Sequence, residues 1–196
     1  MNRFNKKIYT GRLLLNDIAF LICNTPQIIG ALRNKKISKA FIEKIMLVTT
    51  AVNGCVYCEW FHAKKAAGEG IPDSEIKNML KLQFDASASD FELPALLYAQ
   101  HYAETDRQPD AMMTERFFAF YGDKTANHIL LFIRMIFFGN LSGNTWDAVM
   151  SRLKGKPAEK SNPIFEMVFF LLSFWLMLPL MFFVNRTNRK TVYKAE

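Results

Sequence analysis

Cysteine is scarce in this sequence, with three residues among 196. A secreted scaffold held together by disulfides would need several pairs, so this count excludes that class and indicates a reducing compartment. A chain of this length buries enough apolar surface to fold without covalent cross-links. The cysteines are therefore available for chemistry.

Strand-like alternation of apolar and polar residues between hairpin turns is also absent, as are internal repeats and low-complexity tracts. Apolar residues follow helical spacing instead, which predicts an all-α fold. No nucleic-acid-binding motif accompanies the net charge of +7, which is spread over several clusters of lysine and arginine. We therefore expect no nucleic-acid partner, and the positive charge favours an anionic membrane surface.

Two of the three cysteines meet a histidine in one short run, Cys55-x-x-Cys58-x-x-x-His62. On a helix these offsets place the three side chains on one face, so both sulfurs and an imidazole can share a site. A helix over residues 38–52, followed by an Asn-Gly pair, predicts that a second helix begins at or just before Cys55. The positive end of that helix would favour the thiolate, the nucleophilic form of cysteine.

Three interpretations of this run remain open from the residues alone. In a dithiol pair, one thiolate attacks an oxidant or a disulfide, the other cysteine resolves the product, and His62 relays the proton. A structural zinc site would need a fourth ligand, and the remaining cysteine is Cys23, which we expect to be a buried structural thiol. In the third interpretation both cysteines are small core residues. Covalent haem is disfavoured, because Glu59 stands where its attachment motif needs a histidine.

The spacing from Glu43, over eleven residues, to the Cys55-x-x-Cys58-x-x-x-His62 run resembles the signature of the AhpD-like alkylhydroperoxidases in the carboxymuconolactone decarboxylase superfamily. A second segment, residues 138–147, resembles the end of the same domain. The resemblance implies an all-helical domain that assembles as a trimer or hexamer and needs no cofactor. The implied substrate is a small alkyl hydroperoxide, and an external dithiol would restore the protein after each turnover.

Carried over by position, the resemblance assigns catalytic roles to four residues. Glu43 and His62 would form a proton relay, Cys58 would be the attacking thiolate, and Cys55 would resolve it. About 15 Å of helix before the Asn-Gly turn and about 12 Å after it would separate the turn from the two relay residues, so the carboxylate can reach the imidazole or a bridging water. From the residues alone, Glu43 is equally an ordinary surface carboxylate that pairs with Lys39 or Lys44. Members that decarboxylate lactones lack the paired cysteines, so the pair favours peroxide chemistry.

Residues 167–184 form an uncharged apolar run of 18 residues. At ~1.5 Å per residue this run is close to the ~30 Å thickness of a bilayer's hydrocarbon core. Basic residues on both sides leave its orientation open, and burial between subunits or docking at the membrane interface are alternatives to insertion. We divide the chain into a helical thiol-redox domain (1–160), a hydrophobic helix expected to insert into a membrane (163–185), and a basic tail (186–196).

Other polar residues are expected to have structural roles. An Asn-Thr-Pro sequence at 24–26 predicts a break between two helices in the apolar stretch 13–31. The glycines at 139 and 143 are expected to end a helix over 124–138 before a last helix over 145–153, with Asn140, Asn144 and Asp147 holding that turn. His101 and His128 are expected to be structural or solvated, with a place in the redox pocket as the alternative. Tyr57 and Trp60 are expected to pack, with the lining of an apolar substrate entrance as the alternative.

Taken together, the residues and the resemblance predict a membrane-associated thiol-dependent peroxidase or disulfide oxidoreductase, with its redox domain on the cytoplasmic side. The rival hypothesis is a non-catalytic oligomeric scaffold at the membrane. In that case the Cys/Cys/His motif would hold zinc or have no function.

Overall fold

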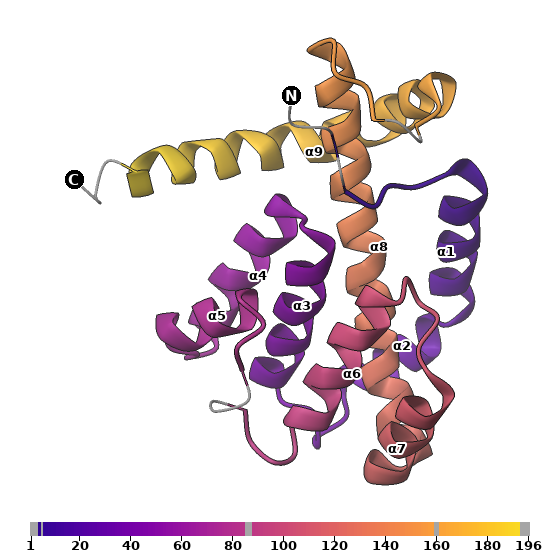
Figure 1. The fold of residues 1–196 in the computed structure, drawn as a ribbon, viewed down its shortest axis with the longest axis vertical. Coiled ribbons are helices and arrows are strands. Elements are labelled where there is room, and N and C mark those ends of the chain that lie inside the picture. Colours follow the sequence, from indigo (N-terminus) through magenta and orange to yellow (C-terminus); the bar gives the residue numbers. More distant parts are fainter. Residues whose placement is uncertain (1–3, 5, 85–87, 159–160, 193–196) are drawn as a thin grey trace.

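A computed structural model describes residues 4, 6–84, 88–158 and 161–192, and this part of the chain contains nine helices and no strand (Figure 1). The all-α prediction is confirmed. The helices are α1 (Gly11–Cys23), α2 (Thr25–Leu32), α3 (Lys39–Asn53), α4 (Val56–Gly68), α5 (Asp73–Leu80), α6 (Leu93–Glu104), α7 (Ala111–Tyr121), α8 (Asp123–Leu153) and α9 (Pro163–Val192).

Helices α3 and α4 form the hairpin that their residues predict. The hydroxyl of Ser38 caps α3 by accepting a hydrogen bond from the backbone amide of Phe41. Gly54 ends α3 in the left-handed conformation, with φ of 70°. Glycine adopts this conformation without the steric cost that a side chain would add. The chain therefore reverses there, and α4 begins at Val56 with Cys55 as its N-cap.

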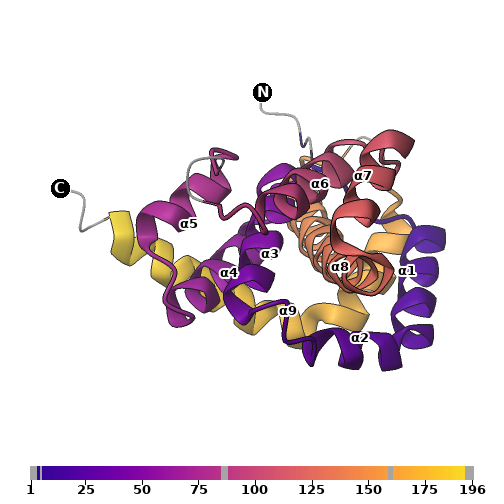
Figure 2. The same cartoon turned by 90° about the horizontal axis from the view of Figure 1, so that it is seen from below.

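Helix α8 is continuous over 31 residues and forms the axis of the domain, with α3, α6 and α7 packed around it (Figure 2). The expected break between Gly139 and Gly143 is therefore wrong, and the segment 145–153 is the last part of α8. Glycine costs only about 1 kcal/mol relative to alanine inside a helix, so close packing of a neighbouring element outweighs it. That neighbouring element is the start of α4.

The predicted break in the N-terminal apolar stretch is confirmed. Helix α1 ends at Cys23, α2 begins at Thr25, and the two helices are bent by 63°. Helix α1 contributes no fully buried side chain to the core. The expectation that Cys23 is a buried structural thiol is wrong, because Cys23 is exposed on the outer side of this helix.

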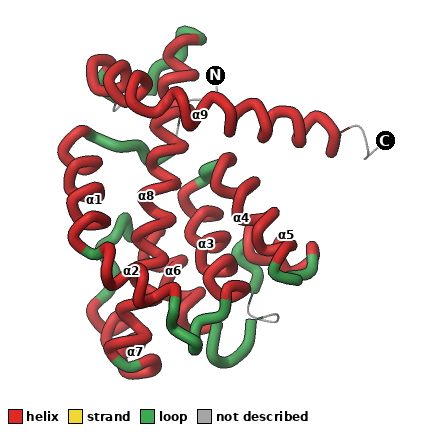
Figure 3. Tube along the Cα trace, turned by 180° about the vertical axis from the view of Figure 1, so that it is seen from behind, coloured by secondary structure: helices red, strands yellow, loops and turns green. Residues whose placement is uncertain are grey.

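Helix α9 lies across the end of α8 and contacts both α8 and α4 (Figures 1 and 3). The prediction of a C-terminal hydrophobic helix is confirmed. Its segment Pro163–Val184, 22 residues long, is apolar enough to cross a membrane. The helix extends to Val192, into the predicted basic tail, and residues 193–196 lie outside the described part of the chain.

Candidate functional site

The two sulfurs of the motif meet at the start of α4. Cys55 is fully buried, and its Sγ accepts a hydrogen bond of 3.3 Å from the backbone amide of Cys58. Cys58 is partly exposed and lies one turn further along the helix. Both cysteines are free thiols. The first turn of α4 is thus capped by sulfur, at the position where a serine, threonine or aspartate oxygen usually accepts this hydrogen bond.

Each thiol changes the pKa of the other. The Cys58 thiol donates a hydrogen bond to the Cys55 sulfur, which lowers the pKa of Cys55 although burial opposes the charge. The pKa of Cys58 is raised, first because its thiol is the donor and second because it is buried. The first ionisation of the pair therefore favours Cys55, whereas partial exposure favours attack by Cys58. That Cys58 attacks first stays a prediction.

Two glycines of α8 make room for the sulfurs. A Cβ atom at Gly143 would lie 2.5 Å from the Sγ of Cys55, and a Cβ at Gly139 would lie 3.9 Å from the Sγ of Cys58. Because glycine has no side chain, the α8 backbone can approach α4 closely at this point. The glycines that we expected to end a helix instead form the wall of the thiol site.

Glu43 and His62, the residues predicted to form a proton relay, are in contact across the α3–α4 hairpin. His62 Nδ1 lies 2.6 Å from Oε2 of Glu43, and Lys65 Nζ lies 2.9 Å from Oε1 of the same carboxylate. Burial alone would raise the pKa of Glu43, but hydrogen bonds from His62 and Lys65 and their positive charges lower it overall. An ionised carboxylate only accepts hydrogen bonds, so Nδ1 of His62 carries the hydrogen, and Nε2 is the ring nitrogen that Glu43 does not contact.

A second polar chain beside the sulfurs was missed by sequence reasoning. The Tyr57 hydroxyl donates to Oδ1 of Asp147 at 2.8 Å, and Lys6 Nζ donates to Oδ2 at 2.6 Å. The negative charge of Asp147 raises the pKa of Cys55, and the positive charge of Lys6 lowers it. Lys6 and Asp147 are 141 positions apart, so no local pattern in the sequence could have linked them. The sequence predicted that Tyr57 packs or lines an apolar substrate entrance and that Asp147 holds a turn, but not that the two are in contact.

Replacing Lys6 with glutamine is expected to move the pH profile of thiol alkylation to higher pH. Cys55 would then face Asp147 without a neutralising cation, so its thiolate would form at higher pH. The measurement is the rate of reaction with iodoacetamide as a function of pH. The control is Lys7→Gln, since Lys7 contacts the Ala103 carbonyl and Asp106 instead. Equal shifts in the two variants would contradict a specific role for Lys6.

Two asparagines of α8 hold the hairpin against this helix. Thr50 donates to Oδ1 of Asn140 at 3.0 Å, and Nδ2 of Asn144 donates to the backbone carbonyl of Asn53 at 2.8 Å. The second bond satisfies a carbonyl at the end of α3, where no partner exists within the helix. Both asparagines are fully buried within the continuous helix α8, so the expectation that they hold a turn at Gly139 to Gly143 is wrong.

The remaining histidines contact other partners. His101 Nε2 accepts from the backbone amide of Asp110, and His128 contacts the Asn34 side chain. Among the described residues no group of three or more His, Cys, Asp or Glu side chains could hold a metal ion.

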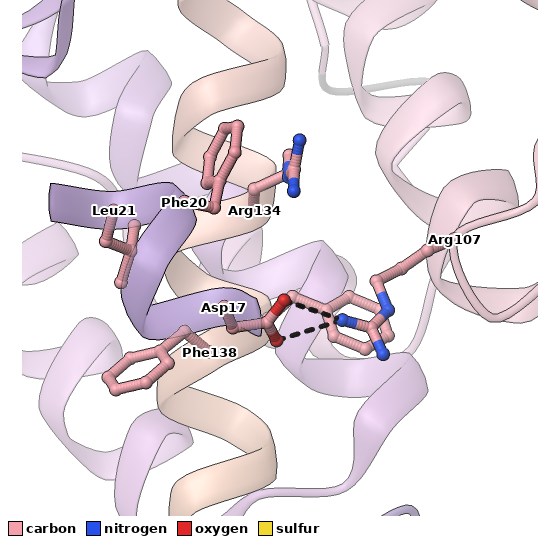
Figure 4. A pocket seen from close by; sticks show the side chains of 7 residues that line it. Asp17, Phe20, Leu21, Arg107, Arg134 and Phe138 are labelled. Atoms are coloured by element: carbon pink, nitrogen blue, oxygen red, sulfur yellow. Dashed lines mark hydrogen bonds and ion pairs between the residues drawn. The ribbon is translucent and has the colours of Figure 1, made fainter. Parts of the chain in front are cut away.

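A separate hollow lies between α1 and α8, where Arg107 from the α6–α7 loop donates to the Asp17 carboxylate (Figure 4). Its volume of about 10 Å³ is that of roughly one water molecule. None of the four predicted catalytic residues lines it. This hollow is therefore too small to hold a hydroperoxide, and neither cysteine lines it.

The protein is an all-helical domain that carries a dithiol at the start of α4 and a buried Glu-His pair on the α3–α4 hairpin. Residues 27–101 match the sequence profile of the carboxymuconolactone decarboxylase family. This match confirms the resemblance for the part of the chain that it covers. The matched range includes all four predicted catalytic residues, whereas α8 and α9 lie outside it. Comparison with curated proteins and with solved structures gave no match.

Proposed function

We propose that this protein is a thiol-dependent peroxidase that reduces alkyl hydroperoxides with Cys55 and Cys58. The observation that carries the proposal is the pair of free thiols at the start of α4, where the Sγ of Cys55 accepts a hydrogen bond from the amide of Cys58, one turn before a histidine whose Nδ1 contacts Glu43. The family includes both AhpD-like peroxidases and decarboxylases. The paired thiols favour the peroxidase, because a lactone decarboxylation has no use for a two-electron reductant.

The chemistry has two steps in the protein. The Cys58 thiolate attacks one oxygen of the hydroperoxide, so an S–O bond forms while the O–O bond breaks, and the released alkoxide takes a proton to leave as an alcohol. The second sulfur then attacks the sulfenic acid, an S–S bond forms, and the hydroxyl group leaves as water with the proton of Cys55. One hydroperoxide and two thiols thus give one alcohol, one water and one disulfide, which an external dithiol reduces by exchange.

His62 supplies the proton for the alkoxide in this scheme. Glu43 acts as a positioning residue, because its carboxylate fixes the ring and its hydrogen at Nδ1. Lys65 bonds the other carboxylate oxygen, which keeps Glu43 ionised and aligned.

Three further features belong to the proposal. The apolar helix is weak support for membrane association. We place the redox domain on the cytoplasmic side, because the thiols need a reducing compartment. Assembly as a trimer or hexamer rests on the family resemblance alone and stays a prediction.

The test is a single-turnover reaction of the reduced native chain with tert-butyl hydroperoxide. We expect two thiols to be lost for each hydroperoxide consumed, with a disulfide between Cys55 and Cys58 in the peptide map. The Cys23→Ser variant should behave identically, because Cys23 is exposed on α1 and absent from the site. The scaffold hypothesis expects the opposite result: thiols that react no faster than a small free thiol, and zinc that copurifies with the native chain.

A further inference from the structure

Helix α9 packs over the thiol site. Its buried residues Phe169, Met177 and Val184 belong to the same apolar cluster as Cys55 and Trp146. Their spacing of eight and seven residues places them along one side of the helix. The ring of Phe170 stacks on Trp146 with the centroids 5.1 Å apart. One side of α9 is therefore occupied by the domain, directly beside the sulfurs.

The other side of α9 is also apolar, and it is uncovered. Leu172 is 70% exposed, Trp175 67% and Leu176 57%. Only 17% of its most apolar window is buried. A helix that is apolar on all sides requires an apolar environment on all sides, and an exposed patch of this extent marks a membrane or protein contact. Further exposed apolar side chains on α9 are Ile164, Met167, Leu171, Phe182 and Phe183.

The packing of α9 argues against a helix that stands upright in a bilayer. Near its start Glu166 forms an ion pair with Arg152 of α8, and at the end of its apolar segment Val184 is buried against the domain. A spanning orientation would draw α4 into the hydrocarbon, including its exposed charged residues Glu59 and Lys64. Intramembrane charges without partners are costly, so the arrangement fits a helix lying in the membrane plane.

Charge at the two ends of α9 indicates which surface covers it. Lys154 and Lys156 precede the helix, and Arg186 follows its apolar segment, all three exposed. Basic residues that flank an apolar helix at the interface are attracted to anionic lipid head groups. A second copy of this chain would bring the same positive charges together.

We infer that α9 docks the domain on an anionic lipid bilayer and that the thiol pair beneath it reduces hydroperoxides of membrane lipids. This inference rests on the proposed peroxidase function and names its substrate class. A helix with its side chains is about 10 Å wide, so the sulfurs lie roughly one helix diameter from the acyl chains. On this side the site is lined by Tyr57, Trp60, Trp146 and Met177, which suit an acyl chain. The products are the lipid alcohol, water and the Cys55–Cys58 disulfide.

The experiment uses the reduced full chain and vesicles of phosphatidylcholine and phosphatidylglycerol that contain phosphatidylcholine hydroperoxide. Leu172→Lys/Leu176→Lys places two charges on the outer side of α9, where we expect vesicle binding and thiol loss to fall at least ~10-fold. Thiol loss with tert-butyl hydroperoxide in solution should stay within about twofold of native, because the variant leaves the sulfurs untouched. The matched control is Met112→Lys/Ala119→Lys on exposed positions of α7, at the far end of the domain (Figure 1).

The outcomes separate the two proposals. The inference is supported if the native protein reacts with both tert-butyl hydroperoxide and the vesicle substrate, and if the α9 variant reacts more slowly with the vesicle substrate. Reaction with tert-butyl hydroperoxide but none with vesicles overturns the inference alone, as does a dimer through α9 that floats with no vesicle. Equal vesicle rates for the α9 and α7 variants overturn it as well. No reaction with either hydroperoxide overturns the peroxidase function itself.

Discussion

Replacing Cys58 with serine is expected to abolish the hydroperoxide-dependent loss of thiols, with the rate constant falling at least ~10³-fold, as for other catalytic nucleophiles. A serine hydroxyl at this position has no accessible ionised form near neutral pH, and Cys58 is the sulfur that a substrate can reach. The measurement is stopped-flow mixing of the reduced variant with tert-butyl hydroperoxide. Serine is close in size to cysteine, so the fold should persist.

The companion variant Cys55→Ser determines which sulfur attacks. If Cys58 attacks first, Cys55→Ser still performs the first step, consumes one thiol and stops at a sulfenic acid on Cys58, which dimedone labels. The lowered pKa of Cys55 favours the reverse order. Dimedone on Cys55 of the Cys58→Ser variant, formed at the native rate, would show that the buried sulfur is the nucleophile and that our assignment is inverted.

The second large effect is expected from Gly143→Ala. The added Cβ would lie 2.5 Å from the Sγ of Cys55, closer than carbon and sulfur approach without displacement, so α4 and α8 must separate or the sulfur must move. Overpacking of this kind costs typically about 1–3 kcal/mol. We also expect the disulfide to form more slowly, because the two sulfurs lose their alignment.

Gly139→Ala is the matched control, one turn earlier on the same face of α8. Its Cβ would lie at an ordinary contact distance of 3.9 Å from the Sγ of Cys58. Alanine is favoured over glycine inside a helix by about 1 kcal/mol, so this variant should be as stable as the native chain or slightly more stable. Urea unfolding and single-turnover thiol loss measure both effects. Similar midpoints for the two variants would contradict the close approach at Gly143.

The α3–α4 hairpin could be predicted because each of its signals is local, whereas the Glu43–His62 contact was expected from the family resemblance. Ser38 caps one helix, Gly54 ends it, and helical spacing then sets where the carboxylate and imidazole lie. The role of Gly143 could not be predicted in this way. Glycine is common at helix ends and also where two backbones approach, and only the neighbouring element distinguishes the two cases.

Long-range contacts account for what the sequence did not reveal. The ion pair between Lys6 and Asp147 depends on an N-terminal segment that Tyr9 ties to α8 through the Thr145 hydroxyl. Composition predicted that the C-terminal helix is apolar. Composition did not indicate which side of this helix packs on the domain, because a helix that is apolar on every side has no face that differs from the others.

The sulfur cap of α4 has a consequence for the reduction potential of the cysteine pair. In the reduced protein the Cys55 sulfur accepts a hydrogen bond from the first turn of the helix, and as a thiolate it also benefits from the helix dipole. A disulfide sulfur is neutral and a poor hydrogen-bond acceptor, so oxidation removes an N-capping hydrogen bond worth about 1 kcal/mol. Stabilising the dithiol in this way makes the couple more oxidising by roughly 20 mV. The oxidised protein is thereby inclined to pass its disulfide to an incoming dithiol, which resets it for the next oxidant.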